Sequence, residues 1–361
     1  MAPLIDLAAS RTEQQWLYER RELARSPSIL EGMKPAEELR QRQRMIQVVW
    51  QLKDALGATQ LVAATAATFL QRFYMRETFQ KYDKIIMAGA ATYLACKNEE
   101  NPTSIKTVVQ NLLGQRRGLV GRRYINQYQD PLRQETQTEE FRSVRKQLVA
   151  YEEVLLSTLC FDLTVRHPHF FVLETAKRAW KDDEAAKNVG KVGWHFANES
   201  LALPLCLLYR PHLVAAACIV LACAQLDLPL PAVPLSRDEQ ITLHESMDSE
   251  EGEEPPAFEE EVYWLDVLEV QPEELEEPVA DILHIFTRAE DEFVVQSGAR
   301  LAEWVRPVLA SLPRRPSPAS ADPAPPSALP GIPTATSPLP NGDAGDEDAE
   351  ADVKMKASAV A

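Results

Sequence analysis

The 361-residue sequence predicts an all-α protein of two tandem helical domains followed by a disordered tail. The main observation is a recurring apolar segment: residues 86–97 and 213–224 align without gaps, and five of their twelve paired positions are identical. Both copies consist almost wholly of small and apolar residues, so as helices they must be surrounded by other helices. Such a recurrence indicates two related helical domains. The copies differ at their ends, where Lys97 of the first aligns with Ala224 of the second.

Apolar periodicity and helix-breaking residues predict the helices of the first domain. Leu39, Met45, Ile46 and Val49 recur mostly at three- and four-residue spacings, and Gly57 follows as a closing residue. The second helix is expected to bury Leu61, Thr65, Thr68 and Phe69. A basic, glycine-containing loop is expected over residues 114–134. The five predicted helices cover residues 39–56, 59–75, 84–97, 103–113 and 139–159.

The second domain repeats this scheme after an extended connector. Residues 161–168 contain β-branched residues and a proline, which suit an extended chain, so we place the domain boundary there. Beyond about Ser311 the chain is rich in Pro, Ala, Ser and acidic residues, and cannot bury enough apolar surface to offset its ordering entropy. We therefore expect disorder over residues 311–361. The predicted helices of the second domain cover residues 170–180, 185–200, 211–226 and 278–289.

Composition and charge narrow the functional class. The net charge of -16 argues against a general nucleic-acid binder, since phosphate affinity comes mainly from Lys and Arg. Residues 245–277 hold most of the acidic excess, and are interpreted as a solvated linker or as a docking surface for a basic partner segment. No window has the apolar length of a membrane span and the amino terminus lacks a signal pattern, so we expect an intracellular protein.

The cysteines are predicted to be buried, reduced thiols. They fall inside apolar helical patterns and form no Cys-x-x-Cys pair, which argues against disulfides and zinc. They are Cys96, Cys160, Cys206, Cys218 and Cys223.

An ordered series of short motifs runs through both predicted domains. It includes Trp16-Leu17-Tyr18, Arg72-Phe73-Tyr74-Met75, Tyr93-Leu94-Ala95-Cys96-Lys97-Asn98-Glu99-Glu100-Asn101-Pro102, Phe161-Asp162-Leu163, His167-Pro168-His169-Phe170, Trp194-x-Phe196-x-Asn198-Glu199 and Tyr263-Trp264. Taken in order over roughly residues 13 to 290, the series resembles transcriptional cyclins of the K and T type. The resemblance implies the cyclin fold, in which each of two boxes of about five helices surrounds a small-residue central helix.

The resemblance also implies a domain plan. It has an N-terminal segment over residues 1–38 and a first, kinase-binding cyclin box over 39–163. A second box follows over 164–290 with an acidic insert at 245–277, and the disordered tail covers 311–361.

Two departures from the family pattern affect the expected contacts. Cys96, Asn98 and Asn101 stand where the family commonly has Gly, Val and Thr, while the charged residues around them are kept. Residues 41–45, Gln-Arg-Gln-Arg-Met, replace the apolar docking patch of cell-cycle cyclins. Recruitment of Arg-x-Leu substrates is therefore not expected.

The resemblance implies a regulatory subunit that performs no catalysis itself. Such a cyclin binds and activates a cyclin-dependent kinase that phosphorylates the C-terminal repeat of RNA polymerase II, which promotes elongation in the nucleus. Lys97 and Glu152 match the pair that hydrogen-bonds kinase main chain, and Phe161 and Leu163 match apolar contacts. Neither a cofactor nor a metal is implied, and no direct DNA or membrane contact is expected. The kinase-interface residues implied are Lys97, Glu99, Glu100, Glu152, Phe161 and Leu163.

Other interpretations of these residues remain open. Lys97 and Glu152 could form only a surface ion pair, worth ~0 to 1 kcal/mol. The two histidines around Pro168 could bind a metal, but a helix start at the domain junction explains them more simply. His167 could also activate Cys160 as a nucleophile, but Cys160 lies at an apolar helix end and no oxyanion element is in view.

The alternative function is a nucleic-acid-binding general transcription factor built on two cyclin-like boxes. That function calls for a basic second box and a zinc ribbon ahead of it, which the sequence lacks. A purely scaffolding helical protein would not need the Lys97–Glu152 pair. The basic residues 116–123 could contact RNA or form a solvated loop. No glycine-rich phosphate cradle occurs, so the chain is not itself the kinase.

Overall fold

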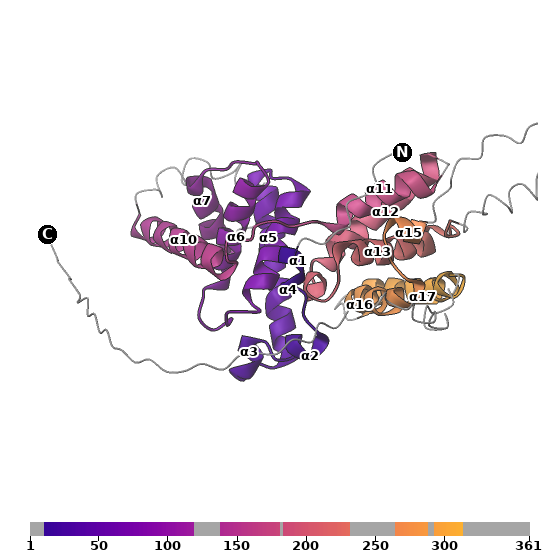
Figure 1. Cartoon of the computed structure of the whole chain (residues 1–361). Helices are drawn as coiled ribbons and strands as arrows, with labels where there is room; N and C mark the ends of the chain where they lie inside the picture. Colours follow the sequence, from indigo (N-terminus) through magenta and orange to yellow (C-terminus); the bar gives the residue numbers. More distant parts are fainter. Residues whose placement is uncertain (1–10, 119–137, 181–182, 232–263, 288–291, 313–361) are drawn as a thin grey trace, which may run out of the picture. The chain divides into compact units, whose positions relative to one another are not determined.

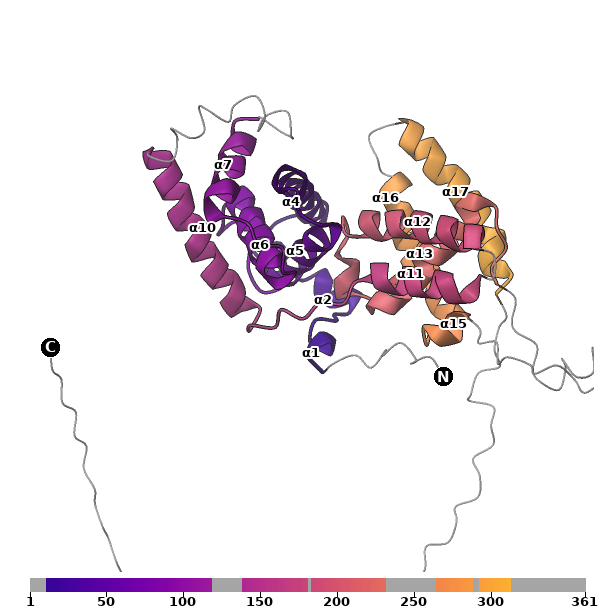
Figure 2. The same ribbon diagram turned by 90° about the horizontal axis from the view of Figure 1, so that it is seen from above.

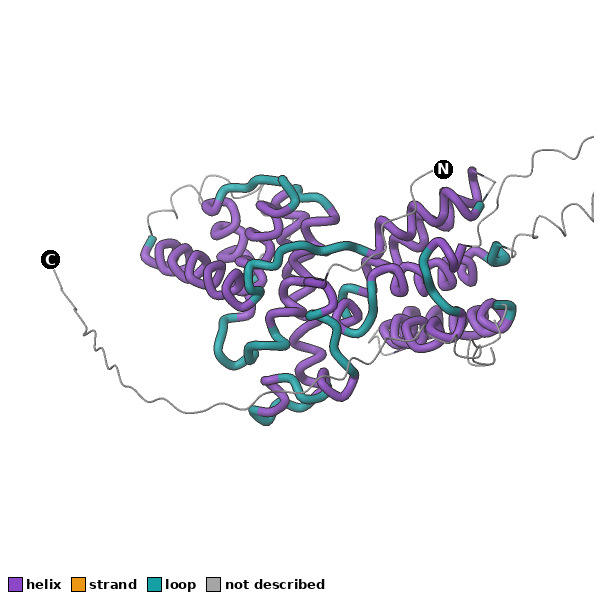
Figure 3. Tube along the Cα trace, in the orientation of Figure 1, coloured by secondary structure: helices purple, strands orange, loops and turns teal. Residues whose placement is uncertain are grey.

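The computed structural model describes residues 11–118, 138–180, 183–231, 264–287 and 292–312, and these contain helices, turns and loops but no strand (Figures 1 and 3). The all-α prediction is confirmed for this part of the chain. Among the helices described, none combines the length and the apolar character that a membrane crossing requires.

The first bundle surrounds one apolar helix, as predicted. Helix α6 packs against four helices of the same bundle, and all its residues from Ile86 to Cys96 are buried except Tyr93. Figure 2 shows α6 among these neighbours. A Cβ atom on Gly89 would lie 2.6 Å from a methyl group of Leu112, so the small residues of α6 permit the close approach of α7. The helices are α4 (Pro35–Leu56), α5 (Gln60–Phe73), α6 (Lys84–Asn98), α7 (Ile105–Arg116) and α10 (Glu139–Thr158).

The second bundle is built in the same way around α13 (Pro211–Leu226). Every residue from Val214 to Ala224 is buried, and α13 packs against α11, α12, α16 and α17. The prediction that both recurring segments form enclosed helices is confirmed. The remaining elements are α11 (Pro168–Ala179), α12 (Asp183–Ser200), η1 (Pro204–Leu207), α15 (Trp264–Val267), η2 (Pro272–Leu275), α16 (Glu276–Thr287) and α17 (Glu292–Ala310).

Local sequence explains where the key helices begin and end. Helix α4 starts at Pro35, four residues before the predicted start, because proline suits the first turn of a helix. It stops before Gly57, whose φ of 65° is the left-handed conformation that glycine adopts easily. The Asp83 carboxylate accepts hydrogen bonds from the amides of Ile85 and Ile86 and so caps α6.

Helix α17 was not predicted from the sequence. Residues 292–310 are helical, and Leu301, Val305 and Leu312 join the core of the second bundle. The ordered fold thus continues past residue 290 and into the first two residues of the segment predicted to be disordered. The rest of that prediction, residues 313–361, lies outside the described residues, as do residues 245–263 of the acidic stretch. The prediction of a solvated stretch is wrong for residues 264–277, because Trp264, Leu265 and Leu275 are buried in the second core.

Two burial predictions were wrong in part. Leu61 is 37% exposed, whereas Thr65, Thr68 and Phe69 are buried as expected. The next residues of the first turn of α5, Val62 and Ala63, have no exposed surface, so the helix turns these toward the core and leaves Leu61 at the edge of the buried face. All five cysteines are free thiols, but Cys160 is exposed and Cys206 is half-buried, so the prediction of five buried thiols fails at these two positions.

Short N-terminal helices precede the first bundle, and a buried ion pair anchors the start of the last of them, α3 (Pro27–Leu30). The Arg42 guanidinium binds the Glu38 carboxylate at 2.7 Å, and both side chains are less than 5% exposed. Arg42 also donates to the carbonyl oxygens of Gln71 and Tyr74, and the Ser26 hydroxyl donates to Glu38. This network joins residue 26 to α4 and α5. The short helices are α1 (Arg11–Gln14), α2 (Arg20–Leu23) and α3 (Pro27–Leu30).

The close packing of the two central helices can be tested by overpacking them. Ala90→Leu and Ala217→Leu, at positions with no exposed surface, should each lower the free energy of unfolding by ~1 to 3 kcal/mol. Chemical denaturation measures the effect, and Ala36→Leu on the exposed start of α4 is the matched control. Equal stabilities for all three variants would contradict the enclosed position of α6 and α13.

Candidate functional site

Lys97 and Glu152 form an ion pair at the rim of the first bundle. Lys97 is in the last turn of α6, and its Nζ atom lies 2.6 Å from Oε1 of Glu152 on α10, a residue 55 positions later. The Glu152 side chain is 11% exposed and that of Lys97 is 50% exposed. The ammonium also lies 4.2 Å from the ring centroid of Tyr93, one helical turn earlier, in a cation–π contact. The structure thus brings together two of the predicted site residues.

Both charged groups retain hydrogen-bonding capacity. An ammonium has three donors and a carboxylate has two acceptor oxygens. Within the described residues, one Lys97 donor goes to Oε1 of Glu152, and Oε2 of Glu152 accepts no hydrogen bond. An approaching main chain could therefore accept a bond from Lys97 and donate one to Glu152 without separating the pair. Next to Lys97, burial raises the pKa of the Cys96 thiol to about 11, so this neighbour remains neutral and apolar.

Phe161 lies in an unusual turn directly after α10. Cys160 and Phe161 both have left-handed backbone angles, with φ of 54° and 56°. Residues other than glycine adopt this conformation only at a cost in free energy. The turn leaves the aromatic side chain of Phe161 71% exposed, while Leu163 packs partly against the first core. A strained backbone that exposes a large aromatic group is typical of a contact position.

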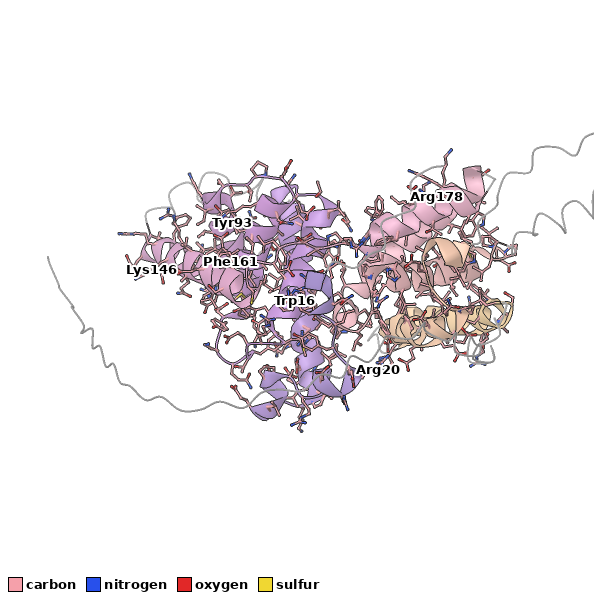
Figure 4. The ribbon with its side chains drawn as sticks, in the orientation of Figure 1. Trp16, Arg20, Tyr93, Lys146, Phe161 and Arg178 are labelled. Carbon is pink, nitrogen blue, oxygen red and sulfur yellow. The ribbon has the colours of Figure 1, made fainter. Side chains whose placement is uncertain are left out.

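A buried tryptophan from the N-terminal segment holds this turn in place. Trp16 is 1% exposed, and its Nε1 atom donates to the Asp162 carboxylate at 2.8 Å. The Arg76 guanidinium lies 4.2 Å from the centroid of a Trp16 ring and donates to the carbonyl oxygen of Thr158 at 2.9 Å. Figure 4 marks Trp16, Phe161 and Tyr93 in this part of the molecule. The N-terminal segment thus positions Phe161 through Asp162.

Glu99 and Glu100 do not join the Lys97–Glu152 pair. The Glu99 carboxylate accepts a hydrogen bond from the Thr65 hydroxyl at 2.7 Å, and the same hydroxyl oxygen lies 2.7 Å from Nε2 of His167. Because the single hydroxyl proton goes to Glu99, Nε2 of His167 must be the donor to Thr65. Burial, reinforced by His169 and Arg72, lowers the pKa of His167 to about 3, so the ring is neutral. Glu99 therefore supports the connector, whereas Glu100 is exposed with a φ of 50°.

Sequence reasoning missed several residues that complete this surface. Tyr93 stands four positions before Lys97, a helical spacing that could have indicated the contact. Val149 is 47% exposed and precedes Glu152 by three positions on α10, which adds an apolar side chain beside the pair. The roles of Trp16 and Arg76 had no signal in the spacing, because their contacts join distant segments.

The alternative sites have simpler structural explanations. His167 is the N-cap residue of α11, Pro168 begins the helix, and Nε2 of His169 lies 2.8 Å from the side-chain oxygen of Asn198. In the described part of the chain, no group of three or more His, Cys, Asp or Glu residues could hold a metal ion. Of the basic loop, Arg116 pairs with Asp83 and Arg117 with Glu140, and residues 119–123 lie outside the described residues.

Comparisons with known proteins relate the chain to cyclins. Residues 13–164 match the family described as "Cyclin, N-terminal domain". The chain is 29% identical to human Cyclin-K over 211 residues, which are 58% of this chain and 34% of that protein. It is 32% identical to Cyclin pch1 of Schizosaccharomyces pombe over 221 residues, which are 61% of this chain and 61% of that protein. It is also 32% identical to Drosophila melanogaster Cyclin-T over 209 residues, which are 58% of this chain and 17% of that protein. The chain thus spans less than two thirds of the length of these relatives.

A solved structure supports the same fold. A chain from the crystal structure of the yeast RNA Pol II CTD kinase CTDK-1 complex superposes with a TM-score of 0.56. The match covers 85% of the present chain and 88% of the other, at 17% sequence identity. At this identity the likeness concerns the fold alone.

Proposed function

We propose that the chain is a regulatory subunit that binds and activates a transcriptional cyclin-dependent kinase, because residues 13–164 match the family model of the cyclin N-terminal domain. The observation that carries the proposal is this family match together with the similarity to cyclins of the K and T type. The kinase would phosphorylate the C-terminal repeat of RNA polymerase II, and the complex would act in the nucleus during elongation.

In this proposal the chain performs no bond-making step. An active kinase requires its helix-borne Glu to pair with the Lys that positions ATP phosphates, and a cyclin holds that helix in place. Lys97 and Glu152 would hydrogen-bond kinase main chain, since each retains hydrogen-bonding capacity beside the other. Phe161 would supply an aromatic anchor, with Leu163 contributing apolar surface at its base. Glu100, exposed at the end of α6, is available at the periphery of the same contact.

The observations favour a protein partner over nucleic acid. Arg116 and Arg117, the described arginines of the basic loop, are bound to carboxylates, and the chain carries a net charge of -16. Phosphate binding needs unpaired cations arranged along one surface, which neither these two arginines nor Lys97 supplies. Lys97, the cation at the candidate site, is instead paired with Glu152 of α10, and α10 and the turn after it carry the exposed residues Val149 and Phe161, a combination suited to a protein surface.

Purification of the tagged full chain from nuclear extract tests the proposal. We expect a cyclin-dependent kinase to co-purify, as identified by mass spectrometry, and to phosphorylate a peptide with the polymerase repeat. Phe161→Ala should reduce kinase recovery about tenfold or more, because an exposed aromatic anchor contributes strongly to binding. Phe161→Gly should also reduce kinase recovery. Its melting temperature should be no lower than that of the wild type, since glycine tolerates the left-handed backbone conformation.

The matched control is Phe170→Ala, which removes a phenylalanine that is 60% exposed on α11. This variant should recover the kinase at the wild-type level. Absence of any kinase from the wild-type preparation would contradict the proposed function. A kinase that co-purifies equally with Phe161→Ala would leave the function standing and remove Phe161 from the interface.

A further inference from the structure

Helices α11 and α12 of the second bundle form a groove that the proposed kinase contact does not use. Its volume is about 570 Å³, and the described residues that line it come from these two helices. Figure 2 shows α11 and α12 lying side by side. The floor is apolar and includes Leu173, Ala176 and Trp194, and the rim carries Lys177, Lys187 and Lys191.

Close packing keeps the floor of the groove in a defined shape. A Cβ atom on Gly190 would lie 3.3 Å from a methyl group of Leu173, so α12 approaches α11 closely at this point. Leu173 is nevertheless 37% exposed, because it lies at the surface edge of this contact. The Trp194 ring is half-buried and meets the His169 ring edge-on at a centroid distance of 4.6 Å. Phe170, which is 60% exposed, precedes Leu173 by one helical turn and extends the apolar surface along α11.

The three lysines at the rim have no partner among the residues that the structure describes. Lys177, Lys187 and Lys191 are all exposed, and none makes an ion pair or hydrogen bond with another described residue. The neighbouring carboxylate on α11, Glu174, is bound by Arg178 at 2.8 Å. Lys187 and Lys191 are four positions apart on α12, where like charges repel and reduce helix stability slightly. Three unpaired cations around an apolar floor are notable in a chain with a net charge of -16.

We propose that this groove docks an acidic segment of a partner protein. An apolar side chain of the partner would be seated on Leu173 and Trp194, and its flanking carboxylates would face the three lysines. Burial of the apolar side chain supplies affinity, and the lysines supply orientation and select against basic sequences. The inference does not depend on kinase activation, because the lining residues are distinct from Lys97, Glu152 and Phe161.

A labelled peptide tests the proposal on the full chain. The probe is a short fluorescein-labelled peptide in which glutamates flank one leucine and one tryptophan, and binding is followed by fluorescence anisotropy. Saturable binding is expected, and it should weaken as sodium chloride is raised. The triple variant Lys177→Glu, Lys187→Glu, Lys191→Glu should lower the affinity about tenfold or more. Trp194→Ala should weaken binding of this peptide. A second peptide, with alanine in place of the leucine and the tryptophan, should bind the wild type less tightly, and Trp194→Ala should leave its affinity unchanged.

The control has the same change in net charge at other sites. Lys34→Glu, Lys106→Glu, Lys146→Glu reverses three exposed lysines of the first bundle and should leave peptide binding unchanged. Equal loss of affinity in both triple variants would overturn the proposal, because binding would then reflect overall charge. Failure of the wild type to bind would also overturn it. A gain of about tenfold or more on deletion of residues 245–261 would identify the chain's own acidic segment as the occupant and overturn the assignment to a partner.

Discussion

Lys97→Glu and Glu152→Lys are each expected to abolish kinase activation while leaving the protein folded. Either change places two like charges within the present 2.6 Å contact and removes a hydrogen-bonding group offered to the kinase. Loss of one partner in a charge pair that becomes desolvated at an interface costs about 2 to 5 kcal/mol of binding free energy. Thermal melting of the Lys97→Glu variant should change little, because the Lys97 side chain is 50% exposed. Phosphorylation of a polymerase repeat peptide by the reconstituted complex measures the effect.

The reciprocal double variant separates a structural role from a contact with the kinase. Lys97→Glu with Glu152→Lys re-forms the ion pair with the charges exchanged between α6 and α10. If the pair serves only the fold, the double variant should regain wild-type activity. We expect it to remain inactive, because kinase main chain would meet a donor where it needs an acceptor. Lys106→Glu, at an exposed lysine of α7, is the control and should activate normally.

Arg42→Met is expected to lower the free energy of unfolding by about 3 to 5 kcal/mol. The substitution leaves the Glu38 carboxylate buried without its cation, and also removes the donors that satisfy the carbonyl oxygens of Gln71 and Tyr74. Removing one partner of a buried ion pair is costly, because the remaining charge cannot regain its hydration. Urea denaturation of the purified chain gives the stability change directly.

The same helix provides a matched control for this prediction. Arg40 also pairs with a carboxylate, Glu37 at 2.7 Å, but its side chain is 57% exposed. Arg40→Met should therefore cost less than about 1 kcal/mol. A double variant with Glu38→Leu and Arg42→Met should recover part of the loss, since it leaves no isolated charge. Equal destabilisation by Arg40→Met and Arg42→Met would show that the buried pair contributes no more to the free energy of unfolding than the exposed pair does.

The presence of two bundles, each around a central apolar helix, could be predicted from local patterns in the sequence. Helices α6 and α13 could be recognised because a run of small and apolar residues has only one stable setting in water, inside a shell of other helices. The start of α11 at Pro168 and the end of α4 before Gly57 were also local effects, set by the backbone preferences of single residues.

Helix α17 could not be predicted from local sequence patterns in the same way. Its apolar residues, including Leu301 and Val305, have helical spacing, but Pro307 interrupts the pattern near the end. An isolated helix of this length is marginal in water, and here packing against α13 and α16 stabilises it. The continuation of helical structure to Ala310 was thus decided by tertiary contacts and not by local propensity.

For the candidate site, the sequence by itself determined which residue types occur and on which helices they lie. It placed Lys97 at the end of an enclosed helix and Glu152 on an amphipathic one. Only the tertiary structure decided that these side chains meet at 2.6 Å, that Glu99 turns to Thr65 instead, and that Phe161 is exposed in a left-handed turn held by Trp16 and Asp162. The physical reason is the sequence separation of the interacting residues. Helix formation depends on neighbours a few positions away, whereas each of these contacts depends on how separate helices pack.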